Sequence, residues 1–137
     1  MSMKKFILLT LLCFPGIALS ATKTPSQKAL DYCATVDSWA AQKVIDAELR
    51  KGKELDREKA TASLINRTKL VSGKNAIQLG EWGQLYTQTI EVSVPYIDNQ
   101  KKPMRLIVSS IISAEECSLT EPAYVDMTLG DYTSHQK

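Results

Sequence analysis

The pair Cys33 and Cys117 constrains the fold of this chain more than any other feature of its sequence. These two cysteines remain once an N-terminal leader is removed, and an even number of cysteines in an exported chain favours a disulfide. Neither lies in a Cys-x-x-Cys motif, and no histidine or basic cluster stands beside either thiol to activate it. We therefore predict a structural disulfide, which closes a long loop and stabilises the fold by roughly 4 to 5 kcal/mol in the chain-entropy model.

The leader itself has the pattern of a secretory signal peptide. Lys4 and Lys5 form a short positive segment, an apolar stretch follows, and small residues precede a predicted cleavage site between Ser20 and Ala21. The third cysteine, Cys13, would leave with this leader. Because a short positive segment of this kind is typical of bacteria, we expect the protein in the periplasm, with secretion into the medium as the second choice.

Without the signal peptide, residues 1–20, the chain is predicted to be a single globular domain, residues 21–137. The whole chain has 17 basic and 15 acidic residues, and the loss of Lys4 and Lys5 leaves 15 of each. This balance gives no electrostatic footprint for nucleic acid and no polybasic membrane anchor. The apolar stretch is short and interrupted by Pro15–Gly16, so we expect no stable membrane insertion.

The first part of the predicted domain has a helical pattern. From about residue 26 to residue 51 there is no proline and no glycine, and small or apolar side chains recur at steps of three and four. The positions of this stripe are Ala29, Cys33, Val36, Ala40, Val44 and Ala47. We predict one long helix that ends at Gly52.

The rest of the predicted domain has the alternation of apolar and polar residues that is typical of strands. We expect strands over about 60–72, from about 85 to Pro95, over 104–114 and over 123–129, although a helix within 54–71 is the alternative for the first. We predict turns at the polar segment 98–103 and at the segment 72–75. Apolar residues on both faces of 104–114 indicate an interior strand.

These elements predict an α+β fold with one long N-terminal helix packed on a three- to four-stranded antiparallel meander. The arrangement resembles the cystatins in outline. The resemblance is one of architecture alone, because the Gln-x-Val-x-Gly segment that cystatins use against cysteine proteases is absent. It therefore implies no protease-inhibiting activity for this chain.

No catalytic pattern stands out. His135 is the only histidine and is the third residue from the end, where nothing would hold it as a base. Glu115 and Glu116 are neighbours at the end of a predicted strand, so their side chains would point to opposite faces and would not form a catalytic pair. Asp37 lies at the margin of the helical stripe, where we expect it to make a structural hydrogen bond rather than to act in catalysis. There is no zinc ligand set and no phosphate-binding loop. We predict no catalytic residues, no metal and no cofactor, and we therefore expect that the protein is not an enzyme.

The aromatic residues indicate a function more clearly than the acidic residues or the histidine do. Trp82 stands between glycines in a predicted loop, Tyr86 follows it, and Trp39 and Tyr32 fall on one flank of the predicted helix. Exposed Trp and Tyr are favoured anchors of protein interfaces, although such rings also fill the edges of cores. We expect these four residues to form a protein-binding surface, with the loop 73–84 as its first candidate.

Size, export, neutral charge and the missing catalytic groups together suggest a protein that works by binding another protein. The first expectation is a periplasmic immunity or inhibitor protein that occludes a toxin or an envelope-targeting enzyme. The second is an accessory subunit of a periplasmic secretion, conjugation or envelope complex. The third is an uncharacterised periplasmic enzyme that uses Asp37 or the Glu115–Glu116 region.

Overall fold

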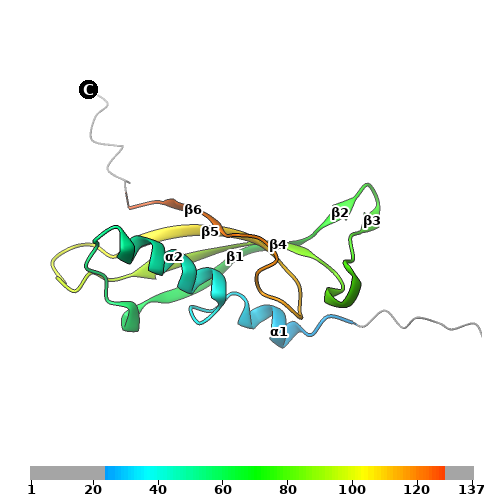
Figure 1. Cartoon of the computed structure of the whole chain (residues 1–137), viewed down its shortest axis with the longest axis horizontal. Helices are drawn as coiled ribbons and strands as arrows, with labels where there is room; N and C mark the ends of the chain where they lie inside the picture. Colours follow the sequence, from blue (N-terminus) through cyan, green and yellow to red (C-terminus); the bar gives the residue numbers. More distant parts are fainter. Residues whose placement is uncertain (1–23, 129–137) are drawn as a thin grey trace, which may run out of the picture.

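A four-stranded antiparallel sheet in the order β1-β4-β5-β6 organises the chain (Figure 1). The structure is a computed structural model that describes residues 24–128. Its main strands are β1 (Thr61–Lys69), β4 (Tyr86–Val94), β5 (Met104–Ile112) and β6 (Ala123–Asp126). The predicted leader with its cleavage site and the terminal His135 lie outside the described residues.

The two central strands separate a buried face from an open one. Side chains along β4 and β5 alternate between buried and more exposed positions, as the period-two pattern predicts. The buried side chains are Tyr86, Gln88, Ile90, Val92 and Val94 of β4 and Met104, Leu106, Val108, Ser110 and Ile112 of β5. On the opposite face β5 has Ile107 and Ile111, which are partly exposed. The expectation that β5 is an interior strand is confirmed, since β4 and β6 pair with it on either side.

The prediction of one long N-terminal helix is wrong, and with it the cystatin-like outline. The described chain is mostly sheet, with a short helix α1 (Gln27–Tyr32) and one helix of 12 residues, α2 (Trp39–Arg50). Neither of the two has the length and apolar character that a membrane-crossing helix needs. The expected helical stripe is therefore interrupted between its second and fourth members, Cys33 and Ala40.

The interruption has a local cause that involves neither glycine nor proline. The segment between the helices reads Ala34-Thr35-Val36-Asp37-Ser38, and four of these five residue types are weak helix formers. The hydroxyl of Thr35 donates a hydrogen bond of 2.7 Å to the carbonyl oxygen of Tyr32. Such side-chain bonds compete with the helical pattern. Ser38 then adopts an extended conformation (φ −65°, ψ 150°) as the N-cap residue of α2.

Helix α2 packs on the buried face of the sheet. Its buried residues are Ala40, Ala41, Val44, Ile45 and Glu48, and all except the last belong to the main apolar core with the inward side chains of β4 and β5. Two alanines at the contact allow the helix backbone to approach the sheet closely. The opposite face of the sheet has no described helix over it, so the fold has two layers.

The segment 54–71, for which the sequence left helix and strand open, mainly forms strand β1 of the sheet. A single 3-10 turn, η1 (Arg57–Lys59), precedes β1, which forms one edge of the sheet and contains a bulge between Leu64 and Asn66. The chain then forms a small hairpin of β2 (Val71–Ser72) and β3 (Asn75–Ala76), followed by a 3-10 turn, η2 (Gly80–Trp82). The predicted turn at 72–75 is confirmed.

Candidate binding surface

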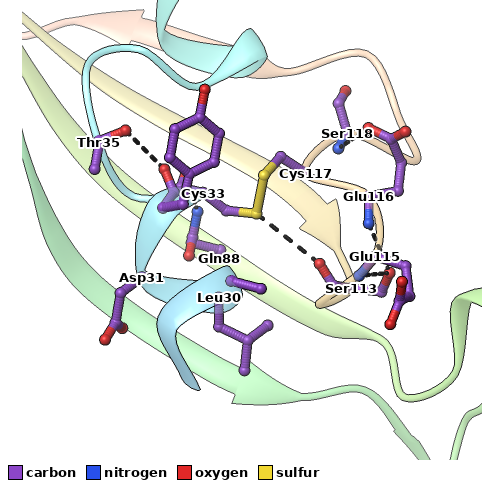
Figure 2. Close-up of a disulfide and its surroundings, with 12 residues drawn as sticks. Leu30, Asp31, Cys33, Thr35, Gln88, Ser113, Glu115, Glu116, Cys117 and Ser118 are labelled. Atoms are coloured by element: carbon purple, nitrogen blue, oxygen red, sulfur yellow. Dashed lines mark hydrogen bonds between the residues drawn. A yellow bond between two sulfur atoms is a disulfide. The ribbon is translucent and has the colours of Figure 1, made fainter. Parts of the chain in front are cut away.

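The disulfide between Cys33 and Cys117 is present, as predicted, with a sulfur–sulfur distance of 2.07 Å. Cys33 follows the last residue of α1, and Cys117 lies in the loop that follows β5 (Figure 2). Cys33 is buried in a second apolar cluster with Leu30, Tyr86 and Ile112. Because Tyr86 begins β4 and Ile112 ends β5, the bond lies at one end of the sheet, which we call the disulfide end.

The loop around Cys117 is held by its own hydrogen bonds (Figure 2). The hydroxyl oxygen of the buried Ser113 accepts bonds of 3.1 Å from the backbone N–H groups of Glu115 and Glu116. The carboxylate of Glu116 in turn accepts a bond of 3.2 Å from the backbone N–H of Ser118. The two glutamates that sequence reasoning discounted as a catalytic pair thus belong to a tight turn beside the disulfide.

A second set of bonds ties α1 to the sheet. The guanidinium of Arg67, on β1, donates to the carbonyl oxygen of Leu30 at 2.6 Å and to the side-chain oxygen of Gln88 at 2.9 Å. Gln88, on β4, donates to the carbonyl oxygen of Cys33 at 2.9 Å. Arg67 also reaches Asp31, and hydrogen bonds from Gln27 and Arg67 hold the pKa of Asp31 below its usual value. These side chains donate to carbonyl oxygens at the end of α1, of which that of Leu30 also accepts from the backbone N–H of Cys33 at 3.1 Å.

An open groove of about 790 Å³ lies between the helices and the loop that contains Cys117. The two aromatic residues among its described lining flank the helix break, because Tyr32 ends α1 and Trp39 begins α2. Their side chains are 53% and 45% exposed. The described residues that line the groove also include the cationic Lys28 and the acidic Asp37, Glu115 and Glu116.

The indole of Trp39 is positioned by a neighbouring lysine. The ammonium nitrogen of Lys43 lies 4.4 Å from the centroid of the Trp39 ring, one helical turn further along α2. The same ammonium group forms an ion pair with Glu121, in the loop between β5 and β6. Lys43 does not line the groove, so the ring is supported from outside it.

Residues 70–85 form an arm that projects from the disulfide end (Figure 1). Its tip is the β2–β3 hairpin, where Gly73 has a φ of +61° at the first central position of a two-residue turn, a conformation that glycine adopts without strain. Val71, Leu79 and Trp82 are exposed on the arm. It therefore presents apolar side chains beyond the edge of the sheet.

The base of the arm is braced by backbone and side-chain bonds. The N–H of Leu70 donates to the carbonyl oxygen of Leu85, that of Leu85 to Ile77, and that of Ile77 to Leu70, at distances of 2.8 to 3.0 Å. The side-chain amide of Gln84 donates to the same three carbonyl oxygens, with its shortest bond, 2.8 Å, to Leu85. The arm is thus attached to the sheet as a defined unit.

The four aromatic residues predicted from the sequence lie in three places. Tyr32 and Trp39 line one groove, as their placement on a common flank suggested. Trp82 is 39% exposed on the arm. Tyr86 is only 8% exposed and packs beneath α1 in the second cluster, so its side chain belongs to the core of the disulfide end.

Sequence reasoning missed a buried carboxylate on α2. Glu48 is 1% exposed, and its oxygens accept from Lys51 and Lys53 at 2.6 Å and from the hydroxyl of Tyr124 at 2.7 Å. Burial raises the pKa of Glu48, but the hydrogen bonds from Lys51, Lys53 and Tyr124 outweigh it and lower the pKa to about 2. The signal available in the sequence was an acidic residue on the apolar side of a helix with two lysines just after it. The cluster ties the end of α2 to β6.

Within residues 24–128 there is no group of three or more His, Cys, Asp or Glu side chains placed to hold a metal ion. Our comparisons with known proteins found no family model that matches the chain, no similar curated protein and no similar solved structure.

Proposed function

We propose that this chain is a small exported bacterial binding domain, without catalytic activity of its own, that occludes a partner protein. A periplasmic immunity or inhibitor protein acting on a toxin or an envelope-targeting enzyme fits this description. The observation that carries the proposal is the arm, residues 70–85, which holds the exposed side chains of Leu79 and Trp82 beyond the end of the sheet. Loops on rigid scaffolds often mediate binding, and tryptophan is enriched among the residues that dominate binding energy.

The shape of the arm suits occlusion. A hairpin with a following turn is narrower than the sheet from which it projects (Figure 1), so it suits a concave cleft better than a flat surface. The bonds of Gln84 and the backbone junction at Leu70 and Leu85 order the arm before a partner arrives. An ordered arm loses less conformational entropy on binding than a mobile loop would.

Two further features support export. The first twenty residues have a signal-peptide pattern, which stays a prediction from the sequence. The Cys33–Cys117 disulfide is of the kind that forms in oxidising compartments such as the periplasm. A binding domain of this size also benefits from a covalent link, because small domains bury a limited apolar area.

An immunity or inhibitor protein is expected to have the gene of its target beside its own, and the test titrates the purified product of that gene with this protein by calorimetry. Wild-type protein should bind it and inhibit its activity. Trp82→Ala and Leu79→Ala should each weaken binding at least about tenfold, as expected for interface anchors. Ile97→Ala is the matched control, because Ile97 is exposed at the opposite end of β4. Equal affinity of Trp82→Ala, Leu79→Ala and wild-type protein would refute the role of the arm.

One observation favours the second candidate, an accessory subunit of an envelope complex. The open face of the sheet pairs Ile107 of β5 with Val125 of β6, and Val125 is 56% exposed. Permanent interfaces are more apolar than transient ones. If this face binds a permanent partner, Val125→Asp should release the protein from an isolated envelope complex while Trp82→Ala leaves it bound.

A further inference from the structure

We infer that the groove between the helices and the Cys117 loop is a binding site for an arginine side chain presented by an extended peptide segment. No residue of the arm lines this site. Its volume of about 790 Å³ is within the usual range of ligand sites. A single side chain does not fill such a space, so the residues on either side of the arginine are part of the ligand.

The charge of the groove selects a cation. Among the described residues that line it, Asp37 and Glu116 contribute two carboxylates and Lys28 contributes one ammonium group. The carboxylate of Glu116 is oriented by the N–H of Ser118 at 3.2 Å, and its backbone is fixed by Ser113. An anionic ligand would face net repulsion here, whereas a guanidinium finds carboxylates that can accept its N–H groups.

The apolar surface of the groove selects a cation with a long aliphatic stem. Tyr32 and Trp39 offer ring faces and edges, and Ala29, Ala114 and Cys117 add small apolar surface between them. The methylene groups of arginine pack on such surfaces while the guanidinium stays near polar groups. Aromatic faces also attract cations directly, and arginine engages in this more often than lysine.

The protein uses the same combination internally. Lys43 places its ammonium group over the ring of Trp39 and pairs it with the carboxylate of Glu121. Ring and carboxylate from separate elements thus hold a cation just outside the groove. The groove repeats these groups, with Tyr32 and Trp39 as rings and Asp37 and Glu116 as carboxylates.

The geometry of the groove depends on the two features that define the disulfide end. The helix break separates Tyr32 from Trp39, and the disulfide holds Cys117 and the turn before it against the end of α1. A continuous helix would leave both rings on one straight flank. The site is therefore present only in the oxidised, folded protein.

The experiment uses Trp39 as the reporter. The chain has two tryptophans, so Trp82→Phe leaves Trp39 as the only one. Fluorescence is titrated with N-acetyl-Gly-Arg-Gly-amide, and with the matched peptides that have leucine, glutamate or lysine in the central position. The arginine peptide should give a saturable change, and about 200 mM salt should weaken it roughly threefold or more because a charged contact is screened.

Variants in the groove separate charge from shape. Asp37→Asn and Glu116→Gln should each raise the dissociation constant of the arginine peptide roughly threefold to tenfold. Glu54→Gln, at an exposed site outside the groove, should leave it unchanged. The inference is overturned if the leucine or glutamate peptide binds as tightly as arginine, if both groove variants bind like the parent, or if no peptide changes the signal. These outcomes are independent of the arm, since Trp82 is already replaced.

Discussion

The side-chain amide of Gln88, on the central strand β4, donates a hydrogen bond of 2.9 Å to the carbonyl oxygen of Cys33. Cys33 is also the residue whose sulfur is bonded to Cys117. The end of α1 is therefore held twice, by a covalent bond to the loop after β5 and by polar bonds to the sheet. Arg67 extends the polar attachment through its bonds to Gln88 and to the carbonyl oxygen of Leu30.

Arg67→Met should lower the free energy of unfolding by about 2 to 3 kcal/mol, because the carbonyl oxygen of Leu30 and the amide oxygen of Gln88 lose a charged donor. Methionine keeps most of the stem length, so packing changes little. Chemical denaturation followed by circular dichroism measures the difference. Lys69→Met, at an exposed position of the same strand, is the control and should change stability by less than about 0.5 kcal/mol. Equal stabilities of the two variants would contradict the role given to Arg67.

Replacing both cysteines by alanine should lower the free energy of unfolding by about 4 kcal/mol, because the disulfide joins residues separated by 84 positions. The loss arises mainly from the greater freedom of the unfolded chain. Urea titrations of the oxidised wild type and of the double variant measure it. Reduced wild-type protein should unfold like the variant, and a loss below about 1 kcal/mol would show that the bond contributes little.

Glu48 makes stability depend on acidity. Its pKa is lowered from 4.5 to about 2 in the folded protein, so its contribution is complete above about pH 4.5 and is lost as the pH falls towards 2. The shift corresponds to a contribution on the order of 3 kcal/mol. Glu48→Gln should therefore be less stable than wild type at pH 7, and the difference should shrink between pH 4.5 and pH 2.

Thermal unfolding at a series of pH values measures this effect. Glu54→Gln, which changes an exposed carboxylate just after the same helix, should follow the wild-type profile. If the difference between Glu48→Gln and wild type stays constant from pH 7 to pH 2, the ion cluster with Lys51 and Lys53 is not what holds this carboxylate ionised.

Gln84→Ala should loosen the arm without unfolding the sheet. Its side-chain amide donates to the carbonyl oxygens of Leu70, Ile77 and Leu85, and alanine removes all three bonds. Amide hydrogen exchange within 70–85 should accelerate roughly fivefold or more, as expected for a net loss near 1 kcal/mol. Exchange in β4 and β5 should stay slow. Unchanged exchange in the arm would mean that the backbone junction alone braces it.

Alternation of side chains was enough to predict most of the sheet. The period-two patterns of β4 and β5 fix which face is buried, and the apolar residues on both faces of β5 correctly indicated a central position. The strand at β1 was harder, because an edge strand with a bulge buries few of its side chains and so has a weak pattern.

The helix break was missed because no glycine or proline marks it. Thr35 and Ser38 end and restart the helix through local hydrogen bonds and capping conformation, which the apolar stripe does not reveal. The alternation that predicted β4 places Tyr86 on the same face as Ile90 and Val92, which is the buried face. The alternation therefore argued against the prediction that Tyr86 belongs to a binding surface. Arg67 and Glu48 acquire their roles from partners in other elements, which a single sequence does not bring together.

We propose that the disulfide end, with its arm and groove, is the surface that meets a partner. The decisive measurement is hydrogen exchange of the protein alone and in complex with the toxin or enzyme that the proposed function predicts to be encoded beside it. New protection is expected in segments 70–85, 26–42 and 113–117, with none in the turn at 95–103 at the opposite end of the sheet. Protection confined to that turn or to the open face around Ile107 and Val125 would contradict this proposal.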